Sequence, residues 1–400
     1  MKKNKKKTWR RPRHKVITEL ARFVLKPYIR IRYGIKVEKF REPQRRNYLI
    51  LLNHQTPFDQ FFAGLAFRDP IYYMATEDIF SMGWISSVLR WVVAPIPIKK
   101  QTTDIQAVMN CIKIAREGGS IAIAPEGNRS YSGKTEYMNP AIAGMAKKLG
   151  LPILLFRIEG GYGAEPRWSD VIRKGNMRAF VARVIEPEEA KAMSNDELMD
   201  AIQEGLYVNE ACTDFEYHHK KLAEYMERMV YICPKCGLSR FQSQEDEVQC
   251  LRCKQKVRYL PTKELQGIDE PFPFRFANDW YEYQKDFINN LDVTTMTATP
   301  IYEDVANVSE VIVYKRKELL EQNASIRLYG DRVCLGQQEY SFDDISTIAV
   351  LGRNKLNIYH KSGLYQLKGD KRFNALKYVH IFYRYKNIRK GDTDGNFLGL

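Results

Sequence analysis

Short apolar runs alternate with amphipathic stretches through residues 46–215. Runs of strand length occur at Tyr48–Leu52, Ser120–Ala124, Ile153–Ile158 and Met177–Ile185. Helical spacing of apolar residues occurs in Thr103–Arg116, Pro140–Leu149 and Ser194–Tyr207. Strands separated by helices predict an α/β domain with a mostly parallel or mixed sheet and helices on both faces.

The N-terminal residues combine positive charge with an amphipathic pattern. Met1–Lys15 contains nine basic residues and no acidic one, which is typical of a solvated tail. Apolar residues then recur at helical spacing at Ile17, Leu20, Ala21, Val24, Leu25, Tyr28 and Ile29. A basic tail followed by such a helix predicts an anchor on an anionic membrane surface. The alternative is that this apolar face packs on the domain.

No apolar stretch of the sequence approaches the roughly 18 residues of a transmembrane helix. Charged residues at Glu19, Arg22 and Lys26 also interrupt any signal-peptide core. We therefore expect a cytoplasmic protein that is peripheral on the inner face of the membrane.

A second apolar stripe precedes Lys99. It comprises Trp84, Ile85, Val88, Leu89, Trp91 and Val92. We interpret it as core, which is the commoner role of such stripes. The alternatives are the wall of an acyl-chain groove or a segment that dips into lipid.

The C-terminal part of the chain is richer in short β-like runs and turns. A short helix is expected at Trp280–Leu291, and strands at Ser325–Leu328, Val333–Leu335, Ile345–Leu351, Lys355–Tyr359 and Leu364–Lys368. A closing helix should turn Phe373, Leu376, Val379 and Phe382 inward. Strands followed by a helix resemble a pleckstrin-homology-like barrel in topology, which leaves both lipid targeting and protein docking open.

Charge indicates the class of partner. The chain has 400 residues, enough for two or three domains, and carries 63 Lys and Arg against 48 Asp and Glu, a net charge of +15. Such an excess favours anionic partners, which include nucleic acid, anionic lipid, coenzyme A and an acidic carrier protein.

Four cysteines form a repeated pair. Cys233 and Cys236, then Cys250 and Cys253, have the Cys-x-x-Cys spacing of a tetrahedral site, and four thiolates indicate structural zinc. Iron at the same ligands is the alternative, and two disulfides are disfavoured in a chain without a secretory signal. The segment resembles a zinc ribbon. Nearby basic residues make nucleic-acid binding an alternative role for this segment. We rank that role below bracing of the fold or docking of a protein partner.

His54 and Asp59 follow the first apolar run and are the main candidates for chemistry. Thr56 can cap a helix and Pro57 suits its first position, so His54 is expected in the turn between a strand and a helix. A histidine oriented by a carboxylate can act as a general base. The plain alternative is that Thr56 and Asp59 form only a capping box.

A second motif, Pro125-Glu126-Gly127-Asn128-Arg129-Ser130, follows the next apolar run. Together the two motifs resemble the first and third blocks of the glycerolipid acyltransferase family, with Asn128 where threonine is usual. Ile96–Lys100 resembles the second block, with Lys100 in place of arginine. Leu151–Phe156 resembles the fourth block, with Leu155 in place of a proline. The resemblance covers about residues 47–210.

The resemblance implies an O-acyltransferase in which His54 takes the proton of an acceptor hydroxyl and Asp59 orients it. Lys99, Lys100, Glu126, Gly127, Asn128 and Arg129 would bind substrate. The donor would be acyl-CoA or acyl carrier protein. The acceptor would be lysophosphatidate, converted to phosphatidate, or another lysolipid or sugar lipid. No Gly-x-Ser-x-Gly motif occurs in the sequence, so direct attack by the acceptor is favoured over a serine acyl-enzyme. The competing class is an inert protein that binds nucleic acid or a protein partner.

The expected order is therefore an α/β domain, a zinc ribbon and a small β domain. The predicted limits are 1–45 for the basic tail and interfacial helix, 46–215 for the acyltransferase domain, 216–262 for the zinc ribbon with a preceding helix, 263–307 for a linker with a short helix, and 308–390 for the β domain.

Overall fold

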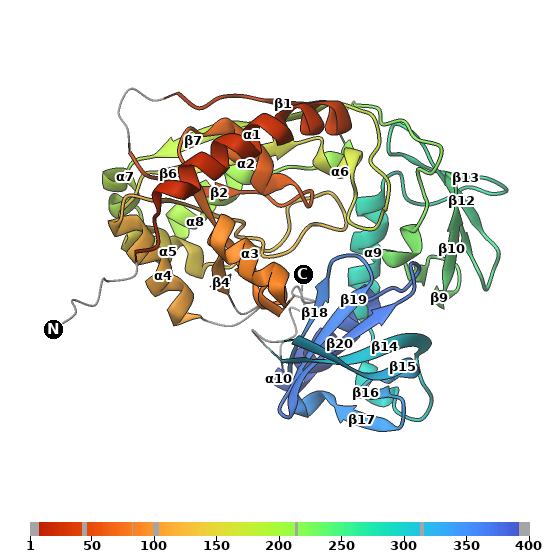
Figure 1. The fold of residues 1–400 in the computed structure, drawn as a ribbon. Coiled ribbons are helices and arrows are strands. Elements are labelled where there is room, and N and C mark those ends of the chain that lie inside the picture. The colour runs from red at the N-terminus through yellow and green to blue at the C-terminus, as the bar shows by residue number, and fades with distance from the viewer. Residues whose placement is uncertain are drawn as a thin grey trace. The chain divides into compact units, whose positions relative to one another are not determined.

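The computed structural model describes residues 8–41, 46–81, 83–98, 104–212, 215–312 and 316–391. These residues form two compact units, whose elements are labelled in Figure 1. The first unit contains the described residues up to 129 together with 135–161 and 176–208. The second contains 130–134, 162–175 and the described residues from 209 onward.

A mixed sheet organises the first unit. Its order is β1-β7-β6-β2-β5-β3-β4. The strands are β1 (Ile35–Val37), β2 (Leu49–Leu52), β3 (Ile71–Thr76), β4 (Ile96–Ile98), β5 (Ser120–Ile123), β6 (Ile153–Glu159) and β7 (Met177–Ile185). The β6–β7 pair is antiparallel, and the other neighbours are parallel. The predicted mixed α/β sheet is confirmed.

Helices cover this sheet. They are α1 (Pro12–Tyr33), α2 (Asp59–Ala66), α3 (Trp84–Val92), α4 (Ile105–Arg116), α5 (Ala141–Leu149), α7 (Pro187–Ala192) and α8 (Asn195–Leu206), with a 3-10 turn η1 (Glu77–Ser81). Leu49 and Leu51 of β2 share a core with residues of α4, α5 and α8. Ile50 and Leu52 are also buried, and side chains alternate along a strand, so the opposite face is covered as well.

Helix α1 has two apolar faces. Ile29 and Tyr33 are buried against the unit, and Ile17, Ala21 and Leu25 on the same side are half-buried. A second face is exposed and comprises Val16, Leu20, Phe23, Val24, Tyr28 and Ile31. The alternative that an apolar face packs on the domain is therefore confirmed for one face, and membrane anchoring by the exposed face stays a prediction.

The interpretation of the Trp84–Val92 stripe as core is wrong. Trp84 is 74% exposed and Trp91 56% exposed, and Ile85 and Val88 are also exposed. The reason is that α3 meets the unit through Ser86, which is its buried residue, and donates from the Ser86 hydroxyl to the carbonyl of Ile79 at 2.6 Å. The small polar residue faces inward, whereas the apolar stripe is exposed except for Leu89 and Val92, which are half-buried.

Helices α1 and α3 contact each other. The Arg13 Nε donates to the carbonyl of Trp91 at 3.1 Å, and its guanidinium lies 4.9 Å from the centre of the Trp91 ring. Both helices lie in front of the sheet in Figure 1. Among the residues that the structure describes, no helix is both long and apolar enough to cross a membrane.

The second unit is built largely from antiparallel strands. A two-stranded ladder joins β8 (Ile232–Cys233) and β9 (Gly237–Leu238). A four-stranded sheet follows, with β10 (Phe241–Gln244), β11 (Glu247–Cys250), β12 (Lys256–Tyr259) and β13 (Leu265–Gly267) in sequence order. The helices and 3-10 turns of this unit are α6 (Gly161–Ala164), which begins in the first unit, η2 (Glu210–Cys212), η3 (Met226–Arg228), α9 (Ala277–Asn289), η4 (Val293–Thr295), η5 (Phe342–Asp344) and α10 (Leu376–Lys390).

A seven-stranded antiparallel sheet, called here the C-terminal sheet, completes this unit. Its order is β17-β16-β15-β14-β20-β19-β18. The strands are β14 (Tyr302–Ile312), β15 (Arg316–Leu328), β16 (Arg332–Leu335), β17 (Gln338–Ser341), β18 (Ile345–Leu351), β19 (Lys355–His360) and β20 (Gly363–Gly369). Phe373, Leu376, Val379 and Phe382 are buried, as the closing-helix prediction requires. Assignment of this sheet to a pleckstrin-homology-like barrel stays a prediction.

One predicted element is absent. A helix was expected between residue 216 and the first cysteine of the 216–262 segment, but the described residues 216–231 hold only the 3-10 turn η3. His218 instead forms an isolated antiparallel bridge with Lys174. Leu222, Met226 and Met229 of this stretch are nevertheless buried, so its apolar residues pack into the core of the second unit without forming an α-helix.

Candidate active site

Strand β2 is central in the mixed sheet and delivers Asn53 and His54 at its carboxyl end. Asn53 is fully buried and bridges to β6: its Nδ2 donates to the carbonyl of Ile158, and its Oδ1 accepts from the Ile158 N–H, both at 2.8 Å. This pair of bonds fixes the backbone just before His54. Sequence reasoning assigned Asn53 no role, because burial of a polar side chain cannot be read from one sequence.

The structure brings His54 and Asp59 into direct contact. The Nδ1 of His54 lies 2.8 Å from Oδ2 of Asp59. The Asp59 side chain is 1% exposed, whereas that of His54 is 27% exposed. A proton on Nδ1 shared with the carboxylate leaves Nε2 as the nitrogen that can accept a proton from a substrate.

Asp59 is held by the loop that it helps to shape. Its carboxylate accepts the backbone N–H of Gln55 at 2.7 Å and that of Thr56 at 3.0 Å. It also accepts the Thr56 hydroxyl at 2.7 Å. These bonds satisfy a buried charge, as such a charge requires.

The predicted helix start is corrected by these contacts. Helix α2 begins at Asp59, not at Pro57, and its N-cap position is Phe58, which has no capping side chain. The Thr56 hydroxyl donates to Asp59 and accepts from the N–H of Phe58 at 3.1 Å. Thr56 therefore organises the turn, and the capping-box alternative explains only the contact from the Thr56 N–H to Asp59.

Glu126 supports the same loop from the second motif. Its Oε1 accepts the backbone N–H of His54 at 2.9 Å. The residue keeps some accessible surface, but its carboxyl lies among protein atoms, and this burial raises its pKa to about 8. The negative charges of Glu136 and Asp59 raise it further, against the opposing effect of the His54 bond.

Gly127 and Arg129 lie in the turn after β5. Gly127 has a φ of +68°, a left-handed conformation that favours glycine, and its N–H donates to the carbonyl of Ala124 at 3.0 Å. The Nε of Arg129 donates to the carbonyl of Gln55 at 3.0 Å. This bond joins the two motifs. Asn128, between them, is half-buried.

Lys99 and Lys100 lie outside the described residues, although β4 ends immediately before them at Ile98. Whether these lysines bind substrate stays a prediction, as does direct substrate contact by Glu126, Gly127, Asn128 and Arg129.

The four cysteines converge in the second unit. The Sγ atoms of Cys233 and Cys253 are 3.5 Å apart, and those of Cys236 and Cys250 are 3.6 Å apart. All four sulfurs lie within 4.8 Å of one another, and none is in a disulfide. Tetrahedral zinc with bonds of about 2.3 Å would hold its sulfurs about 3.8 Å apart, so the donor set fits that ion.

Comparison with known proteins gives a consistent class. Residues 34–158 match a family model described as Acyltransferase. The chain is 24% identical over 185 residues to the 1-acyl-sn-glycerol-3-phosphate acyltransferase of Bacillus subtilis, covering 46% of this chain and 89% of that protein. It is 30% identical over 114 residues to the enzyme of the same name from Borreliella burgdorferi, covering 28% of this chain and 45% of that protein.

Among solved structures, the chain is similar to the 1-acyl-sn-glycerophosphate acyltransferase PlsC from Thermotoga maritima. The identity is 21% and the TM-score 0.39, over 48% of this chain and 75% of that one.

The family model and the named relatives thus indicate a protein of the acyltransferase class. Residues 34–158 form an acyltransferase domain, which confirms the resemblance carried by the two motifs, and the protein is an acyltransferase enzyme.

Proposed function

We propose that the protein moves a fatty acyl group from acyl-CoA or acyl carrier protein to the free hydroxyl of lysophosphatidate, giving phosphatidate. The observation that carries the proposal is the 2.8 Å contact between His54 Nδ1 and the buried Asp59 carboxylate. The names of the Bacillus and Borreliella relatives support this choice of acceptor.

The reaction needs a base that takes the proton of the acceptor hydroxyl and then gives it to the leaving thiolate. The Nε2 of His54 takes the proton of the acceptor hydroxyl while the hydroxyl oxygen attacks the thioester carbonyl carbon. The carbon–sulfur bond then breaks, and the departing thiolate takes the proton back from the imidazolium. Asp59 stabilises that imidazolium while it exists and keeps the ring in one tautomer.

Arg129 is the proposed site for the acceptor phosphate. A guanidinium matches phosphate geometry with parallel N–H donors. Its Nε is already used on the carbonyl of Gln55, the residue next to His54. An arginine fixed in this way is joined to the loop that carries the base, which would align the bound phosphate with His54.

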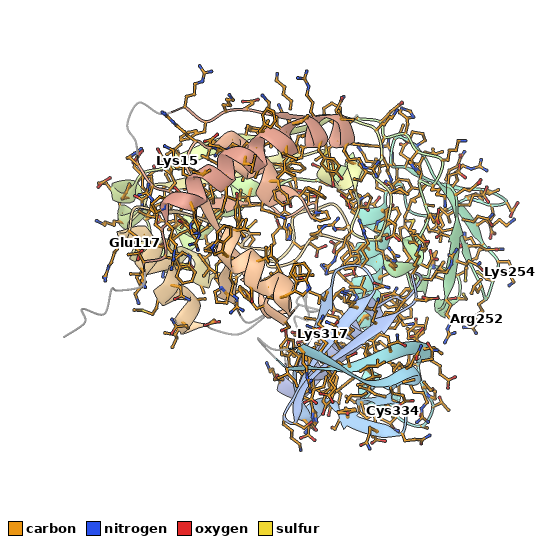
Figure 2. The ribbon with its side chains drawn as sticks, in the orientation of Figure 1. Lys15, Glu117, Arg252, Lys254, Lys317 and Cys334 are labelled. Carbon is orange, nitrogen blue, oxygen red and sulfur yellow. The ribbon has the colours of Figure 1, made fainter. Side chains whose placement is uncertain are left out.

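We also propose that the enzyme works as a peripheral protein on an anionic membrane, at the inner face. The exposed face of α1 supplies Phe23 and Ile31, and α3 supplies Trp84 and Trp91. Lys15, drawn on α1 in Figure 2, is exposed beside this face, as are Lys26 and Arg30. Apolar and basic residues together favour the interface of an anionic leaflet.

Structural zinc at Cys233, Cys236, Cys250 and Cys253 is proposed on the sulfur geometry. The four thiolates fill a tetrahedral shell, which leaves no position for substrate. Arg252 and Lys254, labelled in Figure 2, flank Cys253 and are exposed. Arg252 Nη1 donates to the carbonyl of Cys236 at 3.1 Å, so this basic residue braces the cysteine turn.

A direct assay tests the proposed reaction. Purified protein would be given a labelled acyl thioester and, separately, lysophosphatidate, lysophosphatidylcholine, monoacylglycerol or a sugar lipid. We expect phosphatidate to form fastest, because the other acceptors lack an exposed phosphate monoester. Faster transfer to an acceptor without that group would contradict the assignment of lysophosphatidate.

A further inference from the structure

The segment that directly follows Arg129, Ser130–Lys134, belongs to the second unit. Ser130–Lys134 lies within the matched acyltransferase domain, yet it packs as part of the second unit, as does Tyr162–Gly175. A single peptide bond joins Arg129 to Ser130. Whatever fixes Ser130–Lys134 therefore restrains the backbone of Arg129.

Tyr131 is the main anchor of this short segment. It is 1% exposed and belongs to the core of the second unit. The guanidinium of the buried Arg167 lies 4.4 Å from the centre of the Tyr131 ring. Arg167 Nη2 also donates to the carbonyl of Val350 on β18 at 3.3 Å. A cation held over a ring away from water is a strong contact of its kind, so Arg167 connects Tyr131 to the C-terminal sheet.

A second anchor lies at Gly133. A Cβ atom at Gly133 would come within 2.5 Å of the Tyr162 ring, so the ring packs directly on this backbone. The Tyr162 hydroxyl accepts from Trp168 Nε1 at 3.2 Å. The carbonyl of Gly133 accepts the N–H of Glu210 at 2.9 Å.

The four-stranded sheet β10–β13, which carries Cys250, also contacts Tyr162–Gly175. The buried guanidinium of Arg173 lies 4.9 Å from the Trp168 ring and 5.0 Å from the ring of Tyr259 on β12. Residues from the C-terminal sheet and from the four-stranded sheet thus pack on Tyr162–Gly175, which in turn packs on Ser130–Lys134.

We propose that Tyr131 and Arg167 are positioning residues for the acceptor phosphate. They hold the chain directly after Arg129 and so restrain the backbone that carries this arginine. The inference rests on the proposed function, in which Arg129 binds the phosphate of lysophosphatidate. A misplaced Arg129 guanidinium weakens binding of the lysophosphatidate acceptor and leaves the acyl-CoA site unchanged.

The test compares steady-state constants for five variants of the full-length enzyme. Tyr131→Leu removes the ring, and Arg167→Met removes the cation. Tyr131→Phe is the matched control, because the ring remains and the Tyr131 hydroxyl has no partner among the described residues. Arg332→Met is the second control, since Arg332 also lies over a tyrosine of this unit, Tyr329, at 4.0 Å.

We expect Tyr131→Leu and Arg167→Met to raise KM for lysophosphatidate roughly tenfold or more, as small misplacements of binding groups do. KM for acyl-CoA should not change, and turnover of monoacylglycerol, which lacks the phosphate, should match wild type. Both controls should behave as wild type. If Tyr131→Leu does not fold, as judged by thermal unfolding, Arg167→Met alone decides the outcome.

An Arg129→Ala variant separates the positioning role of Tyr131 and Arg167 from the assignment of Arg129 to the acceptor phosphate. If it raises KM for lysophosphatidate while Arg167→Met and any folded Tyr131→Leu do not, the positioning role is wrong and the proposed function stands. If Arg129→Ala leaves that KM unchanged, the phosphate assignment itself fails. Equal loss toward lysophosphatidate and monoacylglycerol in Arg167→Met would show general damage and would also overturn the positioning role.

Discussion

The two oxygens of Asp59 accept bonds from His54, from two backbone N–H groups and from the Thr56 hydroxyl. An asparagine would offer one acceptor oxygen and an NH₂ group that faces donors. We expect Asp59→Asn to lower turnover by at least about 100-fold, because His54 loses its orienting charge.

The matched control for this substitution is Asp279→Asn. Asp279 also lies in the first turn of a helix and accepts a backbone N–H, that of Phe276 at 2.9 Å. It should lose some stability and no turnover. If both variants lost turnover to the same extent, the orienting role of Asp59 would be unsupported.

Glu126 predicts a pH-dependent stability. Its pKa is about 8 in the folded protein against an ordinary value of 4.5, so the folded state holds a proton that the unfolded chain releases. Stability from this group is complete below about pH 4.5 and is lost as the pH rises toward 8. In Glu126→Gln the side chain cannot titrate but keeps an oxygen for the His54 N–H.

The melting temperature of Glu126→Gln relative to that of wild type should therefore rise as the pH increases from 5 to 8. Above pH 8 the difference should stay constant. Thermal unfolding across this range measures the difference. Parallel curves for the two proteins would mean that the Glu126 carboxyl is already charged in the folded state.

For single residues, the sequence predicted which side chains form the candidate site better than it predicted which atoms they contact. His54 and Asp59 were predicted as a pair, and the structure places them 2.8 Å apart. Glu126 was expected on the substrate, which stays a prediction, and its bond to the backbone N–H of His54 was not foreseen. A contact from a side chain to a backbone N–H about seventy residues away leaves no local pattern, so no periodicity could reveal it.

Among the elements, α1 and α3 carry the membrane proposal. Replacing Phe23 and Ile31 together with serine removes two exposed apolar side chains from α1. Inserting such a side chain into lipid contributes on the order of 1.5–3 kcal/mol. We expect binding to anionic vesicles to weaken by at least about tenfold in a sedimentation assay at high salt.

Val305 and Leu319 supply the control, because they are apolar residues of the second unit and are 58% and 56% exposed. Replacing both with serine should leave vesicle binding unchanged. The membrane face would be misassigned if the control pair weakened binding and the α1 pair did not.

A truncation test of the basic tail should end at Lys7. The backbone N–H groups of Trp9 and Arg10 donate to Glu117 at 2.7 and 2.8 Å, and His14 Nδ1 lies 3.0 Å from the Tyr72 hydroxyl. Removal of Met1–Lys7 should weaken vesicle binding at low salt, where exposed charges are least screened, and leave turnover on a detergent-dispersed acceptor unchanged. Equal vesicle binding at low salt would show that these lysines have another role.

Apolar periodicity located most elements to within a few residues, because a buried face repeats with the period of its helix or strand. It did not tell which face of an apolar helix is buried. The α3 stripe was interpreted as core, yet the buried residue is Ser86. Inward and outward apolar faces have the same pattern, and only tertiary packing distinguishes them.

For the whole molecule, the four cysteines predict one bound metal ion. We expect about one zinc per chain in protein purified under reducing conditions, measured by elemental analysis, and loss of that zinc in Cys233→Ser and Cys250→Ser. Loss should unfold the cysteine segment locally, since structural zinc binding is coupled to folding. Cys334→Ser is the control, because Cys334 is a buried cysteine of the same unit outside the cluster. Protein without zinc or iron would contradict the site.

The division of the chain into units could not be predicted from its sequence. The expected boundaries followed the chain in order, whereas Ser130–Lys134 and Tyr162–Gly175 pack with residues after 209. Such a segment is too short to show a periodicity of its own. Its packing partners, among them Arg167 for Tyr131, become visible only in the folded chain.

The central claim is that His54 is the base for acyl transfer. The most direct measurement is the initial rate of phosphatidate formation from acyl-CoA and lysophosphatidate by wild type and His54→Ala, with equal melting temperatures verified first. General-base catalysis contributes roughly 10²–10⁴-fold, so the variant should lose at least about 100-fold in rate. A folded His54→Ala enzyme with near wild-type turnover would contradict the account.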